Sequence, residues 1–340
     1  MEASKRATLK DVAKKAKVSV GMASRVLGNY GSYSERTRLQ VLSAAKALDY
    51  RPNVVARSLR LGRTKAIGVV VSNIVSYHWT TFVRGIEAAA SAQGYQVILG
   101  TTADEAKTEK DYIWALHERN VDGIVLSPSP ENESMLVKLA KEEFPMVLVE
   151  SDMASVNVPR INVDNRLAAR RATHYLLDLG HRKIALVAGT QALPSGYDRL
   201  QGYLDALAEF NIAREESLIG YGEYRFEDAY HATRRLMSLR ERPTALLVCN
   251  ESMTGATLQC LKDLGIRVRD DLSLIAFDDP DWTSFFTPAL TTVRTPRQEV
   301  AKLALETLLA RIADPASERA AAVERIIPTE LVVRESCKAV

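Results

Sequence analysis

Residues 8–27 read TLKDVAKKAKVSVGMASRVL, a pattern that predicts two short helices joined by a tight turn. The first helix is expected over residues 9–16, where apolar side chains recur at helical spacing. Ser19 is a favourable N-cap for the second helix, which is expected over residues 20–27. A helix-turn-helix places its second helix in the major groove of DNA. This stretch therefore predicts a DNA-binding domain.

A third helix is expected over residues 34–48, because helices as short as the first two are not stable in water without a partner. Leu39, Leu42, Ala45 and Leu48 recur there at every third position, and we expect them to form its apolar face. The three helices together are expected to form one small domain.

The positive charge of the chain is concentrated at its N-terminus. Residues 1–65 contain 15 Lys and Arg against 4 Asp and Glu, whereas residues 66–340 contain 30 against 38. Clustered cations on a small domain neutralise DNA phosphates and release their counterions. The basic helices lack Trp and Phe on their apolar faces, so a membrane surface is the weaker interpretation. The charge distribution therefore favours double-stranded DNA as a partner.

The composition of the 340 residues argues against several other classes of protein. No apolar run approaches the roughly 18 residues of a membrane span, so we expect no membrane partner. The first ten residues lack the apolar core of a secretion signal, which favours a cytoplasmic protein. Cys249, Cys260 and Cys337 form no CxxC pair, and the five histidines are not clustered. We therefore expect no metal site and no cofactor.

From residue 66 onward, β-branched runs alternate with amphipathic helical stretches. Continuous apolar strands separated by helices of about 10–15 residues indicate parallel sheets, so the predicted fold class is α/β with two doubly wound parallel-sheet lobes. The expected strands are Ile67–Val71, Gln96–Thr101, Gly123–Leu126, Met146–Glu150, Ile184–Ala188, Ser217–Tyr221, Ala245–Cys249, Leu274–Phe277, Thr291–Arg294 and a final run at Glu330–Arg334. The expected helices are Phe82–Ala92, Lys107–Glu118, Arg166–Leu179, Arg199–Phe210, Ala229–Leu239, Met253–Leu264 and Gln298–Ile312.

Changes of composition divide the chain into three parts. Residues 1–52 are expected to form the helix-turn-helix domain, residues 53–65 a hinge helix with its linker, and residues 66–340 a two-lobed domain. The break between the lobes is expected near residues 162–166. Ligands of doubly wound sheets bind outside the carboxyl ends of the strands, so two facing lobes would enclose a small molecule.

Motifs of common enzymes are missing from the sequence. It contains no GxxxxGK[ST] phosphate loop, no GxGxxG after a strand, no GxSxG elbow and no HExxH. Residues 189–196 (GTQALPSG) lack the lysine of a phosphate loop and are expected to line a pocket as a strand-to-helix loop. An enzyme with a DNA-binding head would need a nucleophile, base or metal constellation, and none is recognisable. We therefore expect that the protein is not an enzyme.

Short motifs in a fixed order resemble the lactose-repressor/galactose-repressor (LacI-type) family of bacterial transcription regulators. They cover nearly the whole chain and include TLKDVAKKAKVS, ASRVL, YRPN, VVARSL, TKAIGVVV, FVRGIEAAA, VDGIVL, LGHRKIALVAG, LSLIAFDD and FFTPALTTV. The resemblance implies a repressor with a three-helix DNA reader, a hinge helix and a body of periplasmic-binding-protein type. The body would cross between its lobes again near residues 290–296 and 325–330. A homodimer on a pseudo-palindromic operator, controlled by a small polar effector, is also implied.

The resemblance places Val20, Gly21 and Met22 at the base edges. Val20 and Met22 can offer apolar contact to a thymine methyl, but no bidentate hydrogen bond. Gly21 either permits close approach of the backbone or reflects relaxed selection. Arg25 is the best candidate for direct reading, because its guanidinium can pair with guanine O6 and N7. The alternative for Arg25 is a structural salt bridge.

Further DNA contacts are expected beside the recognition helix and in the hinge. Ser19, Ser24 and Asn29 are expected to hold phosphates, which fix register without reading sequence. The hinge segment VVARSLR is too short to be helical alone and reads as a linker without DNA. On DNA, the resemblance implies that it folds and enters the minor groove, with Leu59 as the wedge and Arg57 beside phosphates.

The resemblance maps ligand contacts onto both lobes. The expected effector-binding residues are His78, Trp79, Ser129 and Glu150 in the first lobe, and Arg199, Tyr224, Asn250, Asp278 and Phe286 in the second. His78 and Trp79 are expected just before a helix that begins at Thr80. Such a mixture of donors, acceptors and aromatic faces suits a polyhydroxylated ligand. Trp79, Tyr224 and Phe286 fit core positions equally well.

The class of effector is the least determined part of this interpretation. His78 and Arg199, as two potential cations, favour a sugar acid of the gluconate or ketogluconate type over a neutral sugar, whereas Glu150 argues against it. A transport-type sugar-binding protein without a regulatory role is the alternative for the body, and the basic head argues against it. The chain carries no leucine heptads after its last expected strand, so a dimer is predicted rather than a tetramer.

Overall fold

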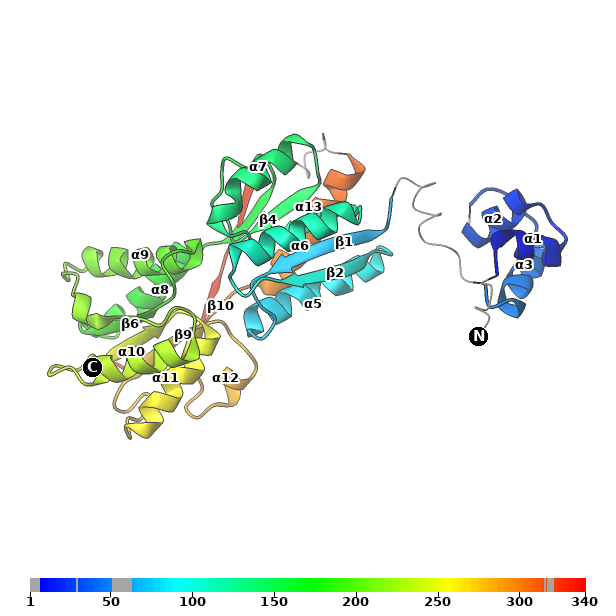
Figure 1. Ribbon diagram of the computed structural model, residues 1–340. Helices are drawn as coiled ribbons and strands as arrows, with labels where there is room; N and C mark the ends of the chain where they lie inside the picture. Colours follow the sequence, from blue (N-terminus) through cyan, green and yellow to red (C-terminus); the bar gives the residue numbers. More distant parts are fainter. Residues whose placement is uncertain (1–6, 29, 51–62, 315, 317–320) are drawn as a thin grey trace, which may run out of the picture. The chain divides into compact units, whose positions relative to one another are not determined.

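The computed structural model describes residues 7–28, 30–50, 63–314, 316 and 321–340 (Figure 1). The chain forms two compact units, residues 1–64 and residues 65–340. Asn29, Arg57 and Leu59, which the sequence assigns to DNA contacts, lie outside the described residues, as does nearly all of the expected hinge.

Three helices of the first unit pack around one small core. They are α1 (Leu9–Ala16), α2 (Val20–Gly28) and α3 (Glu35–Ala47). Thr8 begins α1 with a capping box, in which the Thr8 hydroxyl accepts from the Asp11 backbone and the Asp11 carboxylate accepts from the Thr8 backbone. Lys17 then adopts a left-handed conformation (φ 55°) and makes the tight turn before α2. The predicted helices are confirmed, with ends that differ by one residue at most.

The predicted apolar face of α3 is confirmed at Ala45 and Leu48 and wrong at Leu39 and Leu42. Leu39 is 59% exposed and Leu42 is 40% exposed, whereas Val41, Ala44 and Ala45 contribute to the core of this unit. The reason is geometric, because each helical residue turns by about 100° and a row of every third residue therefore drifts around the helix. Leu39 lies about 120° around the axis from Ala45, whereas Val41 lies only about 40° away.

The second unit contains two six-stranded sheets. The first sheet has the order β11-β5-β4-β3-β1-β2, with all strands parallel. One of its cores lies under α5 and α13, and the other lies under α6 and α7. Its elements are β1 (Ala66–Val71), α5 (Tyr77–Ala92), β2 (Gln96–Thr101), α6 (Ala106–Glu118), β3 (Gly123–Leu126), α7 (Glu133–Lys141), β4 (Met146–Val149), β5 (Arg160–Val163), α13 (Arg297–Ala313) and β11 (Glu324–Ile327).

The second sheet has the order β12-β10-β9-β8-β6-β7. Helices α8 and α9 pack together on one face, and α10 and α11 pack together on the other (Figure 1). The sequence predicted a purely parallel sheet. Strand β12 instead runs antiparallel to β10. Its elements are α8 (Asn165–Asp178), β6 (Ile184–Ala188), α9 (Pro194–Glu209), β7 (Ile219–Tyr221), α10 (Phe226–Met237), β8 (Ala245–Val248), α11 (Glu251–Asp263), β9 (Ser273–Phe277), α12 (Trp282–Phe285), β10 (Thr291–Arg294) and β12 (Glu330–Val332).

The two sheets define two lobes, and the chain passes between them at three places within residues 65–340. It crosses from β5 to α8, from β10 to α13, and from β11 to β12. Helix α13 thus follows a strand of the second lobe but packs on β3, β4 and β5 of the first. Each lobe is therefore completed by segments that are distant in the sequence.

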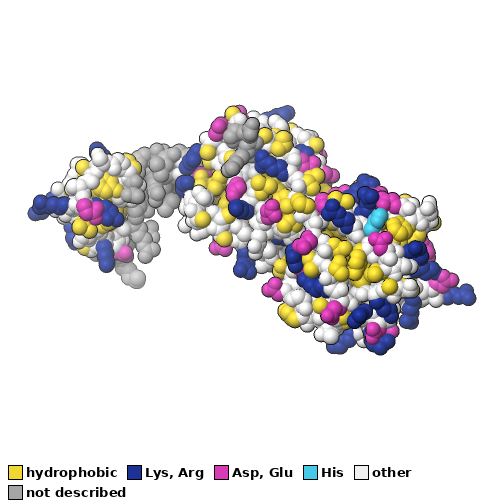
Figure 2. Space-filling model, turned by 180° about the vertical axis from the view of Figure 1, so that it is seen from behind, with side chains coloured by type: hydrophobic (Ala, Val, Ile, Leu, Met, Phe, Trp, Pro, Cys, Tyr) yellow, Lys and Arg dark blue, Asp and Glu magenta, His cyan; other side chains and the backbone are white. Residues whose placement is uncertain are grey.

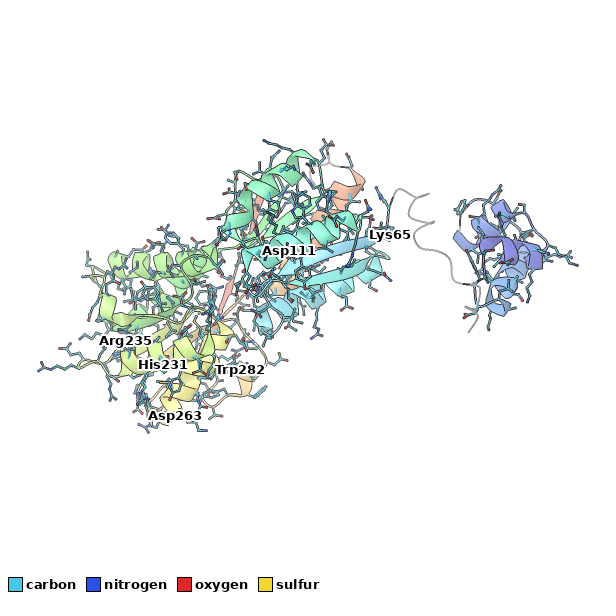
Figure 3. All side chains as sticks on the ribbon, in the orientation of Figure 1. Lys65, Asp111, His231, Arg235, Asp263 and Trp282 are labelled. Carbon is cyan, nitrogen blue, oxygen red and sulfur yellow. The ribbon has the colours of Figure 1, made fainter. Side chains whose placement is uncertain are left out.

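Some elements differ from their sequence-based prediction. Strands β5 and β11 and helix α7 were not predicted; neither strand is continuously buried, so neither gives an unbroken apolar run. The strand expected from Ser217 begins only at Ile219, since Ser217 lies in a short 3₁₀ turn. Arg235, on α10 (Figure 3), donates to the Ser217 carbonyl at 3.0 Å and to the Ile219 carbonyl at 2.5 Å.

A buried histidine joins three segments of the second lobe. His181 is 2% exposed; its Nδ1 lies 2.8 Å from Thr244 Oγ1, and its Nε2 lies 3.0 Å from Ser273 Oγ and 3.1 Å from the Lys338 carbonyl oxygen. Burial lowers the pKa of His181 below its usual value, although the hydrogen bond to Lys338 opposes this shift. The folded lobe therefore prefers the neutral ring.

We expect His181→Ala to lower the free energy of unfolding by about 1–3 kcal/mol, because it leaves Ser273 buried with fewer partners. The wild-type contribution should be complete above pH ~6.5 and should diminish as the pH falls, because the unfolded chain then binds the proton more readily. Urea denaturation of both proteins between pH 5 and 8 measures this. A difference between them that does not shrink toward low pH would contradict the assignment.

The surface of the second unit carries mixed charge. On the face drawn in Figure 2, lysine and arginine side chains are interspersed with aspartate and glutamate. This pattern differs from the cationic excess of residues 1–65. None of the helices in the described ranges is long and apolar enough to cross a membrane.

Candidate functional site

The N-terminal turn of α2 is held in place by its own cap. Ser19 Oγ accepts a hydrogen bond from the Met22 backbone at 3.1 Å, which satisfies one of the free donors at this helix end. Ala23 and Val26 fix the opposite face of the helix in the core. The start of α2 is thereby presented to solvent in a defined orientation.

The exposed face of α2 carries three of the residues predicted to meet DNA. Val20 is 42% exposed, and Gly21 and Arg25 are exposed as well. Met22 and Ser24 are only partly exposed, and Ser24 Oγ accepts from the Tyr30 hydroxyl at 3.2 Å. The geometry therefore groups Val20, Gly21 and Arg25, with Met22 and Ser24 at the margin.

Gly21 provides a test of close approach at this face. A Cβ added at Gly21 would meet only Ser19 Oγ at 3.9 Å, so alanine fits without strain. We expect Gly21→Ala to stabilise the first unit by up to about 1 kcal/mol, because alanine favours a helix more than glycine does. If this face meets DNA as the sequence predicts, the added methyl group should weaken DNA binding, measured by fluorescence anisotropy. A gain in stability with unchanged DNA affinity would show that Gly21 makes no close approach.

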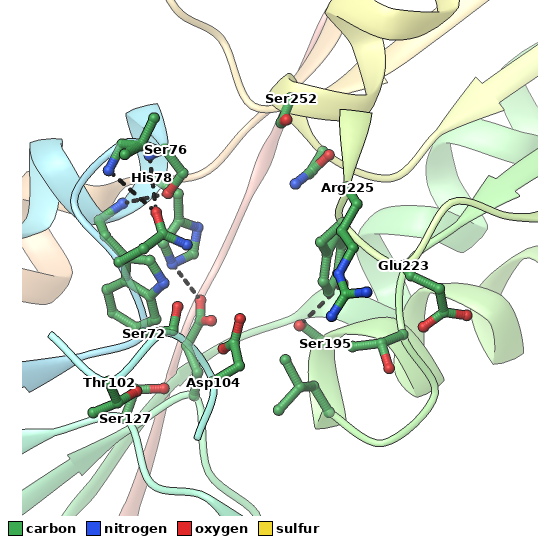
Figure 4. A pocket seen from close by; sticks show the side chains of 18 of the residues that line it. Ser72, Ser76, His78, Thr102, Asp104, Ser127, Ser195, Glu223, Arg225 and Ser252 are labelled. Atoms are coloured by element: carbon green, nitrogen blue, oxygen red, sulfur yellow. Dashed lines mark hydrogen bonds and ion pairs between the residues drawn. The ribbon is translucent and has the colours of Figure 1, made fainter. Parts of the chain in front are cut away.

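A cavity of about 860 Å³ lies between the two lobes of the second unit. Figure 4 shows its two walls, with Ser72, His78 and Asp104 on one side and Ser195, Glu223 and Arg225 on the other. Eight of the nine residues predicted to bind an effector line this cavity. They are His78, Trp79, Ser129, Glu150, Arg199, Tyr224, Asn250 and Asp278.

Phe286 is the predicted residue that does not line the cavity. Its side chain is partly buried against the core of the second lobe, because the chain turns away after the short helix α12. Trp282, the first residue of α12 (Figure 3), contributes an aromatic wall to the cavity instead. The loop at residues 189–196 lines the cavity through Thr190, Leu193 and Ser195, as its sequence predicted.

The sequence predicted that His78 and Trp79 precede the helix. In the structure both residues lie within the first turn of α5. The helix begins early because Ser76 Oγ accepts from the Trp79 backbone at 3.3 Å and caps it. Trp79 is 8% exposed and packs edge-on against Phe82, with ring centroids 5.7 Å apart. Trp79 is thus both a core residue and part of the cavity wall.

Two carboxylates mark the ends of corresponding strands in the two lobes. Glu150 directly follows β4 with φ 53°, and Asp278 directly follows β9 with φ 69°. Asp278 is 1% exposed, and its Oδ1 accepts from the Thr295 hydroxyl at 3.0 Å. Both carboxylates line the cavity at the edge where ligands of such sheets bind.

Two basic side chains on different elements approach Glu150. Its Oε1 lies 3.1 Å from His78 Nε2 and accepts from Arg297 Nη1 at 2.5 Å. Burial alone would raise the pKa of Glu150, but His78 and Arg297 hold this pKa well below its usual range. His78 therefore faces a carboxylate of the protein, which weakens the reason for expecting a sugar acid.

Arg199 is fixed on the other wall by neutral groups. It is 2% exposed; its Nε donates to Asn165 Oδ1 at 2.9 Å, and its Nη1 donates to the Cys249 carbonyl. The guanidinium lies 4.2 Å from the centre of the Phe277 ring. Burial would lower the pKa of Arg199, but the nearby Tyr224 and Asp278 outweigh this effect and raise it. Arg199 is thus a charged donor at the cavity wall.

Other polar groups complete the walls. Tyr224 OH lies 3.1 Å from Ser195 Oγ, and burial raises the pKa of Tyr224 to about 12. Asn250 Oδ1 accepts from the Met253 backbone at 2.8 Å and caps α11. These groups can act as hydrogen-bond partners for a polar ligand.

The buried carboxylate of Glu109, on α6, holds the loop that carries Ser129. Glu109 is 2% exposed and accepts from the Ser129 backbone at 2.8 Å and from Asn132 Nδ2 at 2.9 Å. Burial raises the pKa of Glu109 to about 7, although both hydrogen bonds oppose the shift. Within the described ranges, no group of three or more His, Cys, Asp or Glu is placed to hold a metal ion.

Comparison with known proteins covers both units. The model of "Bacterial regulatory proteins, lacI family" matches residues 8–53, and that of a "Periplasmic binding protein-like domain" matches residues 173–337. The HTH-type transcriptional repressor CytR of Escherichia coli (strain K12) is 33% identical over 333 residues, 98% of this chain and 97% of CytR. The HTH-type transcriptional repressor PurR of Vibrio vulnificus (strain CMCP6) is 34% identical over 333 residues, 98% of this chain and 99% of PurR.

Two solved structures extend the similarity to the fold. The lac repressor dimer bound to operator and the anti-inducer ONPF has a TM-score of 0.88 at 26% identity, covering 98% of this chain and 100% of the repressor chain. The complex of the transcriptional regulator CelR with cellobiose has a TM-score of 0.73 at 28% identity, covering 97% of this chain and 100% of CelR.

Proposed function

We propose that this chain, which belongs to the lacI family of bacterial regulatory proteins, is a repressor controlled by a small sugar. As a member of this family it is a DNA-binding transcriptional repressor. Its finer properties are inferred. It binds a pseudo-palindromic operator as a homodimer in the cytoplasm, with Val20, Gly21 and Arg25 toward the bases.

The observation that carries the proposal is the cavity between the lobes. Polar side chains from both sheets meet there, with Glu150 at the end of β4 and Asp278 at the end of β9. A ligand that touches both would change the relative free energies of open and closed lobes, which is what effector control requires. We infer that the cavity binds its ligand without chemical conversion.

We infer an uncharged polyol as the effector, because the polar groups at the strand ends in the cavity can form hydrogen bonds with hydroxyl groups. Glu150 and Asp278 can accept from hydroxyl groups, and Arg199 can donate to them. His78 faces Glu150, so it is not an additional cation for a sugar acid. CelR, which is similar over nearly its whole length, was solved with the neutral sugar cellobiose.

Two measurements on the purified full-length protein test the proposal. Selection from a random DNA library should enrich a pseudo-palindromic site, and sedimentation should show one dimer bound to it. Addition of a sugar from a panel of neutral hexoses, pentoses and disaccharides should shift the melting temperature and alter operator affinity. A sugar that binds without changing operator affinity, or that is chemically converted, would contradict the proposal.

A further inference from the structure

Arg297 occupies a position that connects both lobes beneath the cavity. It is the first residue of α13, directly after the crossover from β10, and it is 3% exposed. Its Nη1 donates to Glu150 Oε1 at 2.5 Å, and its Nη2 lies 3.9 Å from Asp278 Oδ1. Arg297 therefore reaches toward a carboxylate of each lobe from the segment that joins them.

Arg297 is not part of the cavity wall. Glu150 and Asp278 line the cavity, whereas Arg297 lies behind them. Arg297 Nε and Nη2 have no hydrogen-bond partner among the described residues, although both atoms are buried. A buried cation with unused donors is costly by itself. Its position is best explained by the charge of the two carboxylates.

The carboxylates and guanidinium groups at this place balance one another. We name Glu150, Asp278, Arg199 and Arg297 the inner group. It contains two carboxylates and two guanidinium groups, and all four residues are largely buried. Each carboxylate lies close enough to Arg199 to affect its pKa. The formal charges of these four residues cancel, and His78 Nε2 lies beside them, 3.1 Å from Glu150 Oε1.

We propose that Arg297 sets the charge selectivity of the effector cavity. This inference rests on the proposed function, because it concerns the ligand of the same cavity. With Arg297 present, Glu150 and Asp278 serve as hydroxyl acceptors for an uncharged polyol. Without it, the inner group has an excess negative charge, and a ligand that carries an ammonium group gains a favourable interaction. Arg297 is thus a specificity-determining residue that acts through the carboxylates it neutralises.

The test compares neutral sugars with derivatives that carry one positive or one negative charge. Glucose, galactose and mannose are each compared with their 2-amino sugar and their aldonic acid, and dissociation constants are measured by calorimetry with the full-length protein. The variants are Arg297→Met, which removes the cation, Arg297→Lys, which keeps it, and Glu150→Gln, which removes the opposing charge. Lys302→Met is the matched control, because it removes one positive charge from an exposed position on the same helix.

We expect the wild type and Lys302→Met to prefer a neutral sugar. Arg297→Met should shift the ratio of affinities toward the corresponding amino sugar by about tenfold or more, because charges this close interact strongly in a buried site. Glu150→Gln should shift the ratio toward the aldonic acid, and Arg297→Lys should restore the wild-type preference. A general loss of stability would weaken all three forms of a sugar and leave their ratio unchanged.

Two other outcomes overturn different conclusions. If the wild type binds a neutral sugar and Arg297→Met keeps the same ratio of affinities, the selectivity role of Arg297 is wrong, while the proposed function stands. If the wild type binds none of the nine compounds, or binds an aldonic acid best, the uncharged-hexose effector is wrong, and the inference about Arg297 fails with it.

Discussion

Arg199→Lys is expected to weaken effector binding by about 100-fold while leaving operator binding of the ligand-free protein unchanged. Lysine keeps the charge but loses the planar fork that reaches Asn165 and the Cys249 carbonyl together. Charge-assisted hydrogen bonds contribute about 1.5–3 kcal/mol each, so the loss of one oriented donor to the ligand explains this factor. Calorimetry with the best-binding sugar and anisotropy with operator DNA measure the two affinities.

Thermal denaturation without sugar serves as the control for Arg199→Lys. A lower melting temperature together with weaker operator binding would indicate damage to the fold rather than to the site. Retained sugar affinity in a variant of normal stability would remove Arg199 from the proposed binding residues.

Gly202→Ala is expected to destabilise the second lobe by about 3 kcal/mol or more. Gly202 lies in α9 where this helix crosses α8, and an added Cβ would be 2.0 Å from the Arg166 carbonyl oxygen and 3.0 Å from the Ala169 Cβ. Backbone atoms cannot yield by rotating, so the helices must separate and expose part of their buried contact. Urea denaturation followed by circular dichroism gives the change in the free energy of unfolding.

Gly255→Ala provides the matched control for Gly202→Ala. Gly255 also lies within a helix, α11, but an added Cβ would meet only Phe226 at 4.0 Å. There alanine should stabilise the protein by up to about 1 kcal/mol. Equal effects of the two substitutions would show that α8 and α9 are not packed as closely as described.

The sequence predicted the fold well where periodicity extends over many residues. The first N-terminal helix and the buried central strands, such as Ile184–Ala188, follow directly from apolar spacing. Strand β11 has the exposure pattern of an edge strand, with only Ile327 buried, so it gives no continuous apolar run. The antiparallel pairing of β12 with β10 depends on a long-range return of the chain, which local pattern does not report.

The site was predictable where a polar residue ends an apolar strand. Glu150 and Asp278 follow such strands, and both line the cavity. Arg297 was missed, because it stands at the start of a helix and its role depends on the crossover that places it between two lobes. Phe286 was assigned by resemblance alone, and the turn after α12 directs it to the core of the second lobe.

The three crossings between the lobes have a consequence for synthesis of the protein on the ribosome. The first sheet lacks β11, and its α5 face lacks α13, until residues 297–327 have emerged. The apolar residues beneath α13 therefore stay uncovered while most of the second lobe, from α8 to β10, is being translated. Two lobes interleaved in this way are expected to complete their folding together and late, so a nascent chain stalled before residue 297 should depend on chaperones.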